Sequence, residues 1–154
     1  MILFLDFDGV THPKLIGAQV FCRTPLLWQI LRACPDVQVV FSTSWREAYR
    51  PEELLDFATY GGGEDLAHRF VGQTQRIHAP SDCDPRGLEC RSWLEANGHS
   101  GTVWLALDDD SELFHRMFRQ NLYMVNGDTG LTEEDVAAII QRIQPSVSEA
   151  EGHR

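Results

Sequence analysis

The chain begins with an apolar run that ends in two aspartates and a glycine. Residues 2–5, Ile-Leu-Phe-Leu, are followed by Asp6-Phe-Asp8-Gly-Val10. A short, β-prone run of this kind is typical of a central strand of a parallel sheet, which is buried on both faces. Open α/β sheets bind ligands beyond the carboxyl ends of their strands, where Asp6 and Asp8 would lie. Two carboxylates this close repel each other, and this favours a metal ion between them.

The rest of the sequence alternates between strand-like and helix-like segments. Further strands are expected at residues 37–41, 70–71, 103–107 and 122–125. Helices are expected at residues 51–57, 86–97, 111–119 and 133–143. Another helix is expected to begin at Thr24-Pro25, with Thr24 as the N-cap and Pro25 at the first helical position. This alternation predicts βαβ units, and therefore an α/β fold with a mostly parallel sheet.

Composition limits the cellular and functional classes. With 154 residues, we expect a single domain at 1–144 and a polar, disordered tail at 145–154. The apolar stretches are too short to cross a membrane, and the N-terminus lacks the basic flank of a signal peptide. We therefore expect a cytoplasmic protein. The four cysteines show no CxxC or zinc-ligand spacing, and in that compartment we expect them to be reduced thiols.

The charged residues restrict the partners. The net charge of −10 argues against broad, non-specific nucleic-acid binding, without excluding a local basic pocket. Twelve of the basic residues are arginines and one, Lys14, is a lysine. A positive group deep in a site is therefore expected to be an arginine.

Four short motifs fall at the ends of expected elements. They are Asp6-x-Asp8, Ser42 after the second strand, Arg86 at a helix start and Asp108-Asp109 after a later strand. This order resembles the haloacid dehalogenase-like (HAD) superfamily of phosphohydrolases. The chain is most similar to the small HAD domains associated with RNA repair proteins, over residues 1 to about 143. The matching phrases are Leu5 to Val10, Ser42 to Arg46, Arg86 with Glu89 and Trp93-Leu94, Leu107 to Asp109, and Gly130 to Thr132.

The resemblance implies a Rossmann-like three-layer sandwich, little or no cap domain, and phosphoryl transfer with Mg²⁺. Asp6 would be the nucleophile that forms an aspartyl-phosphate. Asp8 would protonate the leaving oxygen and later activate water. Mg²⁺ would be held by the Asp6 side chain, the Asp8 backbone carbonyl and Asp109. Asp108 would orient the basic residue.

The resemblance also suggests which residues would contact the phosphoryl group. Ser42 would donate a hydrogen bond to it, and Arg86 would neutralise both it and Asp6. The residues that could contact the substrate nearby are Thr43, Arg46 and His12. Trp45 could border the pocket or pack on the next helix, and Arg46 could equally pair with an acid.

Each motif also has a structural interpretation. An isolated DxD is common in surface turns, residues 108–110 could cap the next helix, and Ser42 could be a turn residue. Arg86 could be a solvated residue at a helix start. Lys14 lies in the loop after the first motif, which is the wrong place for the basic residue. The other arginines that could replace Arg86 are Arg91, Arg69 and Arg76.

These observations favour an enzyme. We expect a Mg²⁺-dependent phosphohydrolase with an open site, which suits a bulky phosphomonoester such as an RNA or DNA end. A local positive rim could be formed by Arg46, Arg50, Arg69 and Arg76. A non-catalytic HAD-fold binding or regulatory module is the alternative, although every acid of the motifs is present. A receiver-like signalling domain fits poorly, because the middle strand ends in Ser42 and no late lysine exists.

Overall fold

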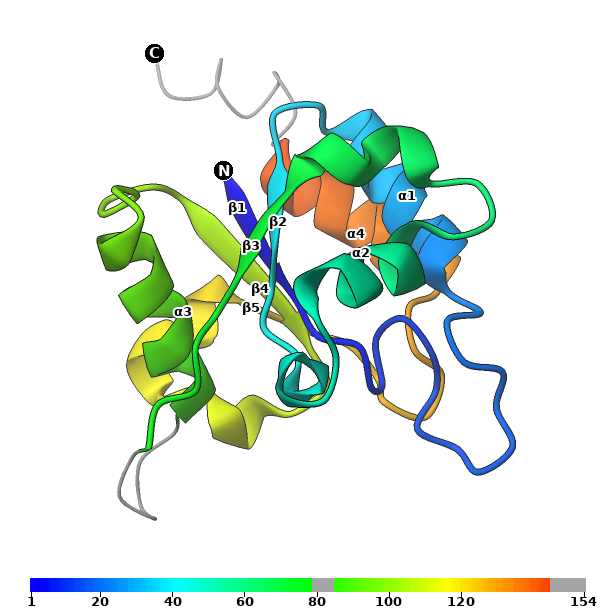
Figure 1. The fold of residues 1–154 in the computed structure, drawn as a ribbon, viewed down its shortest axis with the longest axis horizontal. Coiled ribbons are helices and arrows are strands. Elements are labelled where there is room, and N and C mark those ends of the chain that lie inside the picture. Colours follow the sequence, from blue (N-terminus) through cyan, green and yellow to red (C-terminus); the bar gives the residue numbers. More distant parts are fainter. Residues whose placement is uncertain (79–84, 145–154) are drawn as a thin grey trace.

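The computed structural model describes residues 1–78 and 85–144, and the expected disordered tail lies outside the described residues. Five strands form one sheet in the order β3-β2-β1-β4-β5, and every neighbouring pair is parallel (Figure 1). The strands are β1 (Ile2–Leu5), β2 (Gln38–Phe41), β3 (Phe70–Gln73), β4 (Trp104–Asp108) and β5 (Leu122–Met124). The predicted α/β fold with a parallel sheet is confirmed.

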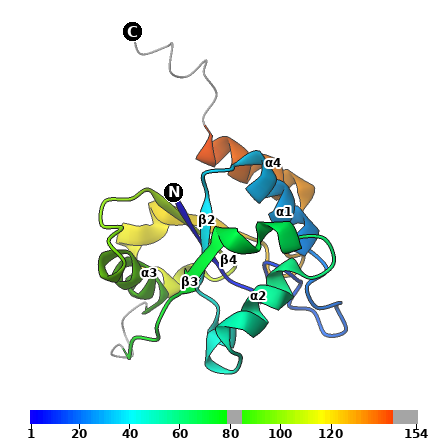
Figure 2. The same cartoon turned by 45° about the horizontal axis from the view of Figure 1, so that its top comes forward.

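Helices cover both faces of the sheet. Helices α1 (Thr24–Ala33), α2 (Pro51–Thr59) and α4 (Glu133–Ile143) lie on one face (Figures 1 and 2). Helix α3 (Pro85–Ala96) lies on the other face. Short 3₁₀ turns connect these elements: η1 (Ser44–Glu47), η2 (Glu64–Arg69), η3 (Ser111–Leu113) and η4 (Arg116–Asn121). The chain is therefore a Rossmann-like three-layer sandwich.

The first strand explains why its sequence is apolar throughout. Leu3 and Leu5 pack into a cluster with residues of α1 and α4, whereas Ile2 and Phe4 pack into a second cluster with residues of α3. All four side chains are buried. A strand that contacts helices on both faces has no position for a polar side chain, and this is why the run lacks alternation.

The central place of β1 fixes the position of the motifs. Leu5 pairs with Phe41 of β2 and with Leu107 of β4. The next residues continue this pairing, because the amide of Ser42 donates to the Leu5 carbonyl at 2.9 Å and that of Asp6 to the Leu107 carbonyl at 3.2 Å. Three motif segments therefore meet at one edge of the sheet.

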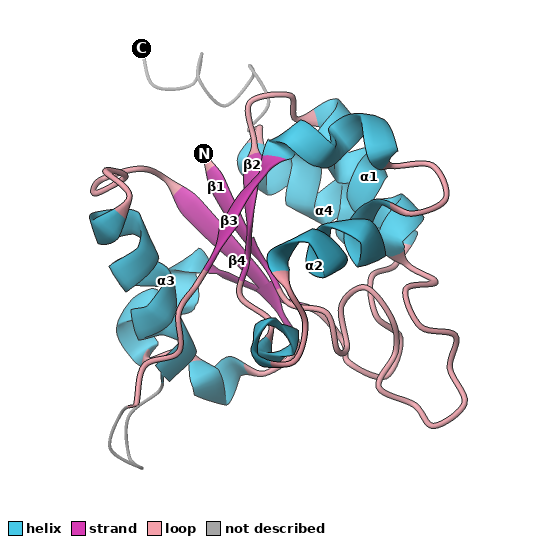
Figure 3. Cartoon of the chain, in the orientation of Figure 1, coloured by secondary structure: helices cyan, strands magenta, loops and turns pink. Residues whose placement is uncertain are grey.

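Between β1 and α1 the chain forms one long loop, with no inserted helix or strand (Figure 3). The Lys14 amide donates to the Gly127 carbonyl at 2.8 Å, so the loop lies against the segment that follows β5. Within the described residues, no helix combines the length and apolar character needed to cross a bilayer.

Two expected helix features are wrong. Thr24 is the first residue of α1 rather than its N-cap, and the preceding Arg23 makes no side-chain capping bond. The Thr24 hydroxyl instead donates to the Phe21 carbonyl at 3.0 Å. The helix expected at 111–119 is replaced by the two 3₁₀ turns η3 and η4, with Phe114 extended between them.

The break at Phe114 has a local cause. The Asp110 carboxylate accepts from the Glu112 amide at 3.0 Å, and the His115 ring accepts from the Met117 amide at 3.2 Å. Such side-chain bonds give the backbone an alternative to helical hydrogen bonds. Each turn is therefore capped separately, and the two do not join into one helix.

Candidate active site

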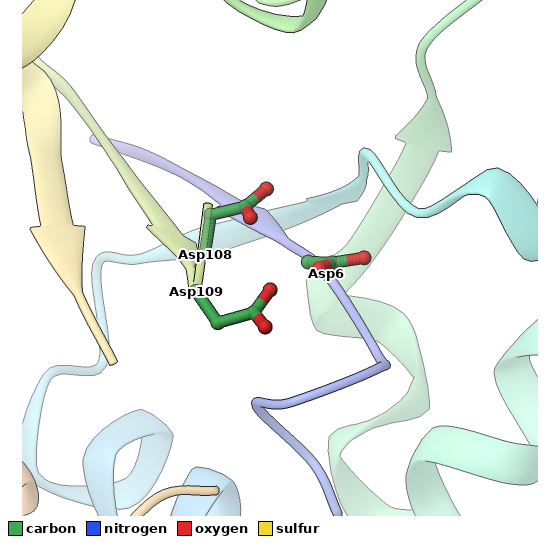
Figure 4. Close-up of side chains that lie close together, drawn as sticks. All are labelled: Asp6, Asp108 and Asp109. Carbon is green, nitrogen blue, oxygen red and sulfur yellow. The ribbon is translucent and has the colours of Figure 1, made fainter. Parts of the chain in front are cut away.

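Three carboxylates converge at the carboxyl edge of the sheet. Asp6 follows β1, Asp108 ends β4, and Asp109 is the next residue (Figure 4). Each offers one oxygen atom, and these atoms lie within 4.8 Å of one another. Asp6 is 4% exposed and Asp108 is fully buried. Buried carboxylates this close need a compensating positive charge.

Arg86 supplies one such charge from the first turn of α3. Its Nη1 atom lies 2.8 Å from Oδ2 of Asp108 and 3.5 Å from Oδ2 of Asp6. Arg86 therefore lies where the sequence placed it, and Asp108 is the acid that holds it. The second Asp108 oxygen accepts from the Asp110 amide at 3.0 Å.

Burial or the neighbouring charges raise the pKa values of all three groups, Asp6, Asp108 and Arg86. Burial raises the pKa of Asp6 to about 8, the charge of Asp108 adds to the increase, and Arg86 opposes it. Burial also raises the pKa of Asp108, against the effect of Arg86. Burial lowers the pKa of Arg86, but the charges of Asp108 and Asp6 outweigh it, so the net pKa of Arg86 is raised. Arg86 stays protonated and leaves part of the acidic charge uncompensated.

Lys14 supplies a second positive charge that the sequence did not place here. Its Nζ atom lies 2.6 Å from Oδ2 of Asp109, and its side chain is half exposed. Arg86 lies between Asp6 and Asp108, and Lys14 lies apart from that position but still reaches the acid cluster through Asp109. The reason is the contact between the Lys14 and Gly127 backbones, which brings the first loop over Asp109.

Asp109 occupies a space left by two glycines. A Cβ atom at Gly9 or at Gly127 would overlap the Asp109 carboxylate. Oδ1 of Asp109 is buried and has no hydrogen-bond partner among the described residues. A free carboxylate oxygen beside two further carboxylates is an all-oxygen donor set, which fits a hard divalent cation such as Mg²⁺. Asp6 and Asp109 are the acids best placed to hold it, because Asp108 is engaged by Arg86.

The two hydroxyl residues after β2 differ in availability. The Ser42 side chain is buried, and its Oγ atom has no hydrogen-bond partner within the described part of the chain. The Thr43 hydroxyl accepts from the Trp45 amide at 3.3 Å and caps η1. Ser42 therefore has the hydroxyl that is left free after β2, whereas the Thr43 hydroxyl shapes the turn.

Arg46 lies in a buried ion pair. Its Nη2 atom is 2.5 Å from Oε2 of Glu89 on α3, and its Nη1 atom donates to the carbonyls of Ser42 and Thr43 at 3.2 and 2.8 Å. The sequence left open whether Arg46 contacts the substrate or pairs with an acid, and in the structure it pairs with an acid. Arg46 thus ties the turn that carries Ser42 to the helix that carries Arg86.

The four arginines that could have formed a positive rim do not cluster. Arg69 is buried at the other end of the sheet, where it donates to the carbonyls that end α1 and precede β2. Arg50 pairs with Glu53, and Arg76 pairs with Glu47. The other rival to Arg86, Arg91, pairs with Glu95 on the outside of α3.

Asp8 is oriented differently from the other acids. Its side chain is 47% exposed, and its two oxygens are held by His12 at 2.9 Å and by the Trp45 indole at 3.0 Å. His12 is buried and is bound to Asp8, so the structure gives it a partner other than a substrate. Trp45 borders the site, and the sequence offered no signal for its bond to Asp8, because that bond joins two distant segments.

The fold is a parallel α/β sandwich, and its site lies at the carboxyl edge of the sheet. The clustered carboxylates and the buried arginine of this site are typical of α/β proteins that bind a divalent cation. Within that class, the chain belongs to the family described as the HAD domain in Swiss Army Knife RNA repair proteins, whose model matches residues 2–136. The resemblance noted from the motifs is confirmed. No curated protein matches the chain at a significant level.

Proposed function

We propose that the protein is a Mg²⁺-dependent phosphohydrolase that forms an aspartyl-phosphate on Asp6. The observation that supports this most is the environment of Asp6, which lies beside the Arg86 guanidinium and the acid pair after β4. Ser42 directly follows the neighbouring strand β2, and its hydroxyl is free within the described residues. Phosphoryl transfer needs a nucleophile in line with phosphorus and positive groups around the phosphoryl oxygens. These residue types meet both needs at one edge of the sheet.

The metal would be held by the side chains of Asp6 and Asp109 and by the backbone carbonyl of Asp8. When bound, Mg²⁺ neutralises phosphoryl oxygens and orients them for attack. Asp6 and Asp109 would supply two charged oxygen ligands, which suits Mg²⁺. Lys14 would leave Asp109 when the cation binds.

In the first step, an Asp6 carboxylate oxygen attacks phosphorus and the bond from phosphorus to the leaving oxygen breaks. The leaving oxygen takes a proton from Asp8. In the second step, water attacks phosphorus, the bond from phosphorus to Asp6 breaks, and Asp8 takes a proton from the water. Arg86 and Ser42 bind phosphoryl oxygens during both steps.

We propose a bulky phosphomonoester, such as a nucleic-acid terminal phosphate, as the substrate. The Asp8 side chain, which would face the leaving group, is half exposed, and no inserted domain lies between β1 and α1. The matching family is described by its place in RNA repair proteins. The net charge of −10 favours a single phosphorylated end over extended contact with a polynucleotide backbone.

The test is phosphate release from p-nitrophenyl phosphate and from 3′- and 5′-phosphorylated oligonucleotides, with Mg²⁺ and then with EDTA. The wild type is expected to turn over only with metal, and Asp6→Asn to lose turnover. The matched control is Asp36→Asn, which changes an exposed aspartate outside the site and should keep full activity. Absence of release from every substrate would contradict the proposal and favour the non-catalytic binding module.

A further inference from the structure

The carboxylate of Asp8 is held by two donors that come from different segments. The Nε2 atom of His12 lies 2.9 Å from Oδ1, and the indole Nε1 of Trp45 lies 3.0 Å from Oδ2. Asp8 itself is half exposed, whereas His12 is buried. A carboxylate with one side open to solvent is thus fixed from its buried side.

The backbone determines which nitrogen of His12 carries the proton. The Phe21 amide lies 3.3 Å from Nδ1 of His12, and a backbone amide can only donate. Nδ1 therefore accepts, and in the neutral ring the proton lies on Nε2. His12 is consequently a donor to Asp8, as the Trp45 indole must be. Because both ring nitrogens of His12 have partners, it is not free to bind a substrate.

The loop is strained at the residue that orients His12. Phe21 has a φ of +60°, in the left-handed region. Among the described residues, no other residue apart from glycine has a positive φ. Such a conformation costs about 1–3 kcal/mol and is retained where the surrounding structure enforces it. The Phe21 ring packs at centroid distances of 5.0 Å from Phe7, 5.2 Å from Trp45 and 5.2 Å from Phe57. The same packing thus orients both donors.

We propose that His12 and Trp45 are positioning residues for Asp8 in the phosphoryl transfer, an inference that rests on the proposed function. They hold the Asp8 carboxyl group toward the leaving oxygen. They also stabilise the carboxylate that forms when the proton moves from Asp8 to that oxygen. Each carboxyl oxygen has two lone pairs, so Asp8 can accept both bonds and still carry a proton.

This role has a signature that depends on the leaving group. A p-nitrophenolate ion departs as a stabilised anion and needs little help from an acid. The ribose oxygen of a nucleotide departs as an alkoxide and needs the proton of Asp8. The ratio kcat/KM reports the steps up to departure of the leaving group, so it isolates proton donation from the later hydrolysis of the aspartyl-phosphate.

The experiment measures kcat/KM of His12→Leu, His12→Gln and Trp45→Phe with p-nitrophenyl phosphate and with a 3′-phosphorylated dinucleotide. General acids contribute about 10²–10⁴-fold, and losing one orienting bond is expected to lower the dinucleotide value about tenfold. The aryl value should fall by less than about threefold on the same argument. His12→Gln should recover most of the loss, because its amide can donate from the place of Nε2.

The control is Trp104→Phe, which removes an indole packed on Phe4, away from Asp8. This variant should leave kcat/KM unchanged for both substrates. Thermal unfolding identifies any variant that does not fold. Equal losses on both substrates, or a His12→Gln variant no better than His12→Leu, would overturn the proposal. A wild type inactive on both substrates would instead remove the proposed function and the inference with it.

A measurement independent of activity tests the contact itself. The indole N–H resonance of Trp45, assigned from its absence in Trp45→Phe, should shift when Asp8→Asn is introduced in the metal-free protein. An unchanged resonance would overturn the inference even if the enzyme is active.

Discussion

Lys14 and a divalent cation compete for the same carboxylate. The ammonium group lies 2.6 Å from Oδ2 of Asp109, and this hydrogen bond raises the pKa of Lys14. We expect Lys14→Met to strengthen Mg²⁺ binding, because the cation no longer displaces an ammonium group. A half-exposed ion pair contributes up to about 1 kcal/mol, so the dissociation constant should fall about twofold to fivefold.

Titration calorimetry of the metal-free protein with Mg²⁺ measures this change. Lys14→Arg keeps the positive charge and serves as the control, with an affinity close to that of the wild type. Weaker Mg²⁺ binding by Lys14→Met would show that Lys14 supports the cation rather than competing with it.

Gly9 is required for both its conformation and its size. Its φ is +78°, and a Cβ atom there would overlap the Asp109 carboxylate. We expect Gly9→Ala to weaken Mg²⁺ binding and to destabilise the protein, because Asp109 must move. Gly98→Ala is the matched control, since Gly98 has a φ of +74° and open space around its Cβ position.

Chemical denaturation of both glycine variants separates the two effects. Gly98→Ala reports backbone strain alone, at about 1–2 kcal/mol. The excess cost of Gly9→Ala reports the overlap with Asp109. Equal destabilisation and unchanged Mg²⁺ binding in the two variants would contradict this interpretation.

Side chains that lie directly after a strand were predictable, and those brought in by a loop were not. Asp6, Ser42 and Asp108 follow apolar runs, and parallel pairing brings the ends of such runs together. Lys14 reaches Asp109 only because its backbone bonds to Gly127, more than a hundred residues away along the chain. No local pattern encodes that contact. The bond from Trp45 to Asp8 was missed for the same reason.

At the scale of elements, the buried pair of Arg46 and Glu89 joins the turn after β2 to α3. Both side chains are only 6% exposed. Arg46→Met leaves the Glu89 carboxylate buried without its partner, which costs about 3–5 kcal/mol in comparable pairs. Arg50→Met is the control, because it breaks an exposed pair with Glu53 and should cost much less stability than Arg46→Met.

Urea unfolding of the two arginine variants gives the comparison. Combining Arg46→Met with Glu89→Leu should recover much of the lost stability, because no buried charge then remains unpaired. A double variant less stable than Arg46→Met alone would show that Glu89 is stabilised by other contacts, such as its 3.2 Å bond from the Ile77 amide.

Elements were predictable where periodicity and capping agree. Helix α4 has the bounds expected from the sequence, and Thr132 and Asp135 form a reciprocal capping box at its start. The apolar periodicity of 111–119 predicted a helix as well, because Phe114 and Phe118 are spaced for one helical face. Both rings are buried, but from two separate turns, since Asp110 and His115 cap each turn locally. Periodicity alone does not distinguish these outcomes.

At the scale of the whole molecule, the buried acids make stability depend on pH. The pKa of Asp6 is raised from 3.8 to about 8. A raised pKa in the folded state means that stability is fully present below the unfolded value and is lost as pH rises through the folded value. The metal-free protein should therefore lose stability between about pH 4 and pH 8, and Asp108 acts in the same direction.

Denaturation in EDTA at several pH values between 4 and 9 tests this dependence. Asp6→Asn should flatten the profile, because the amide does not titrate, and Mg²⁺ should flatten it in the wild type by favouring the ionised carboxylates. An identical slope in Asp6→Asn would assign the pH dependence to other groups.

The central place of β1 also determines how late in synthesis the sheet can finish folding. This strand is synthesised before both of its neighbours in the sheet, β2 (Gln38–Phe41) and β4 (Trp104–Asp108). Until β4 emerges, one hydrogen-bonding edge of an apolar strand has no partner, and such edges are sites of aggregation. Asp6 is thus made well before β4, and its surroundings are complete only after β4 has emerged. A nascent chain that stalls before Trp104 exposes an aggregation-prone strand and lacks the acid cluster of the candidate active site. Translation pausing in this interval is therefore expected to reduce the yield of folded protein.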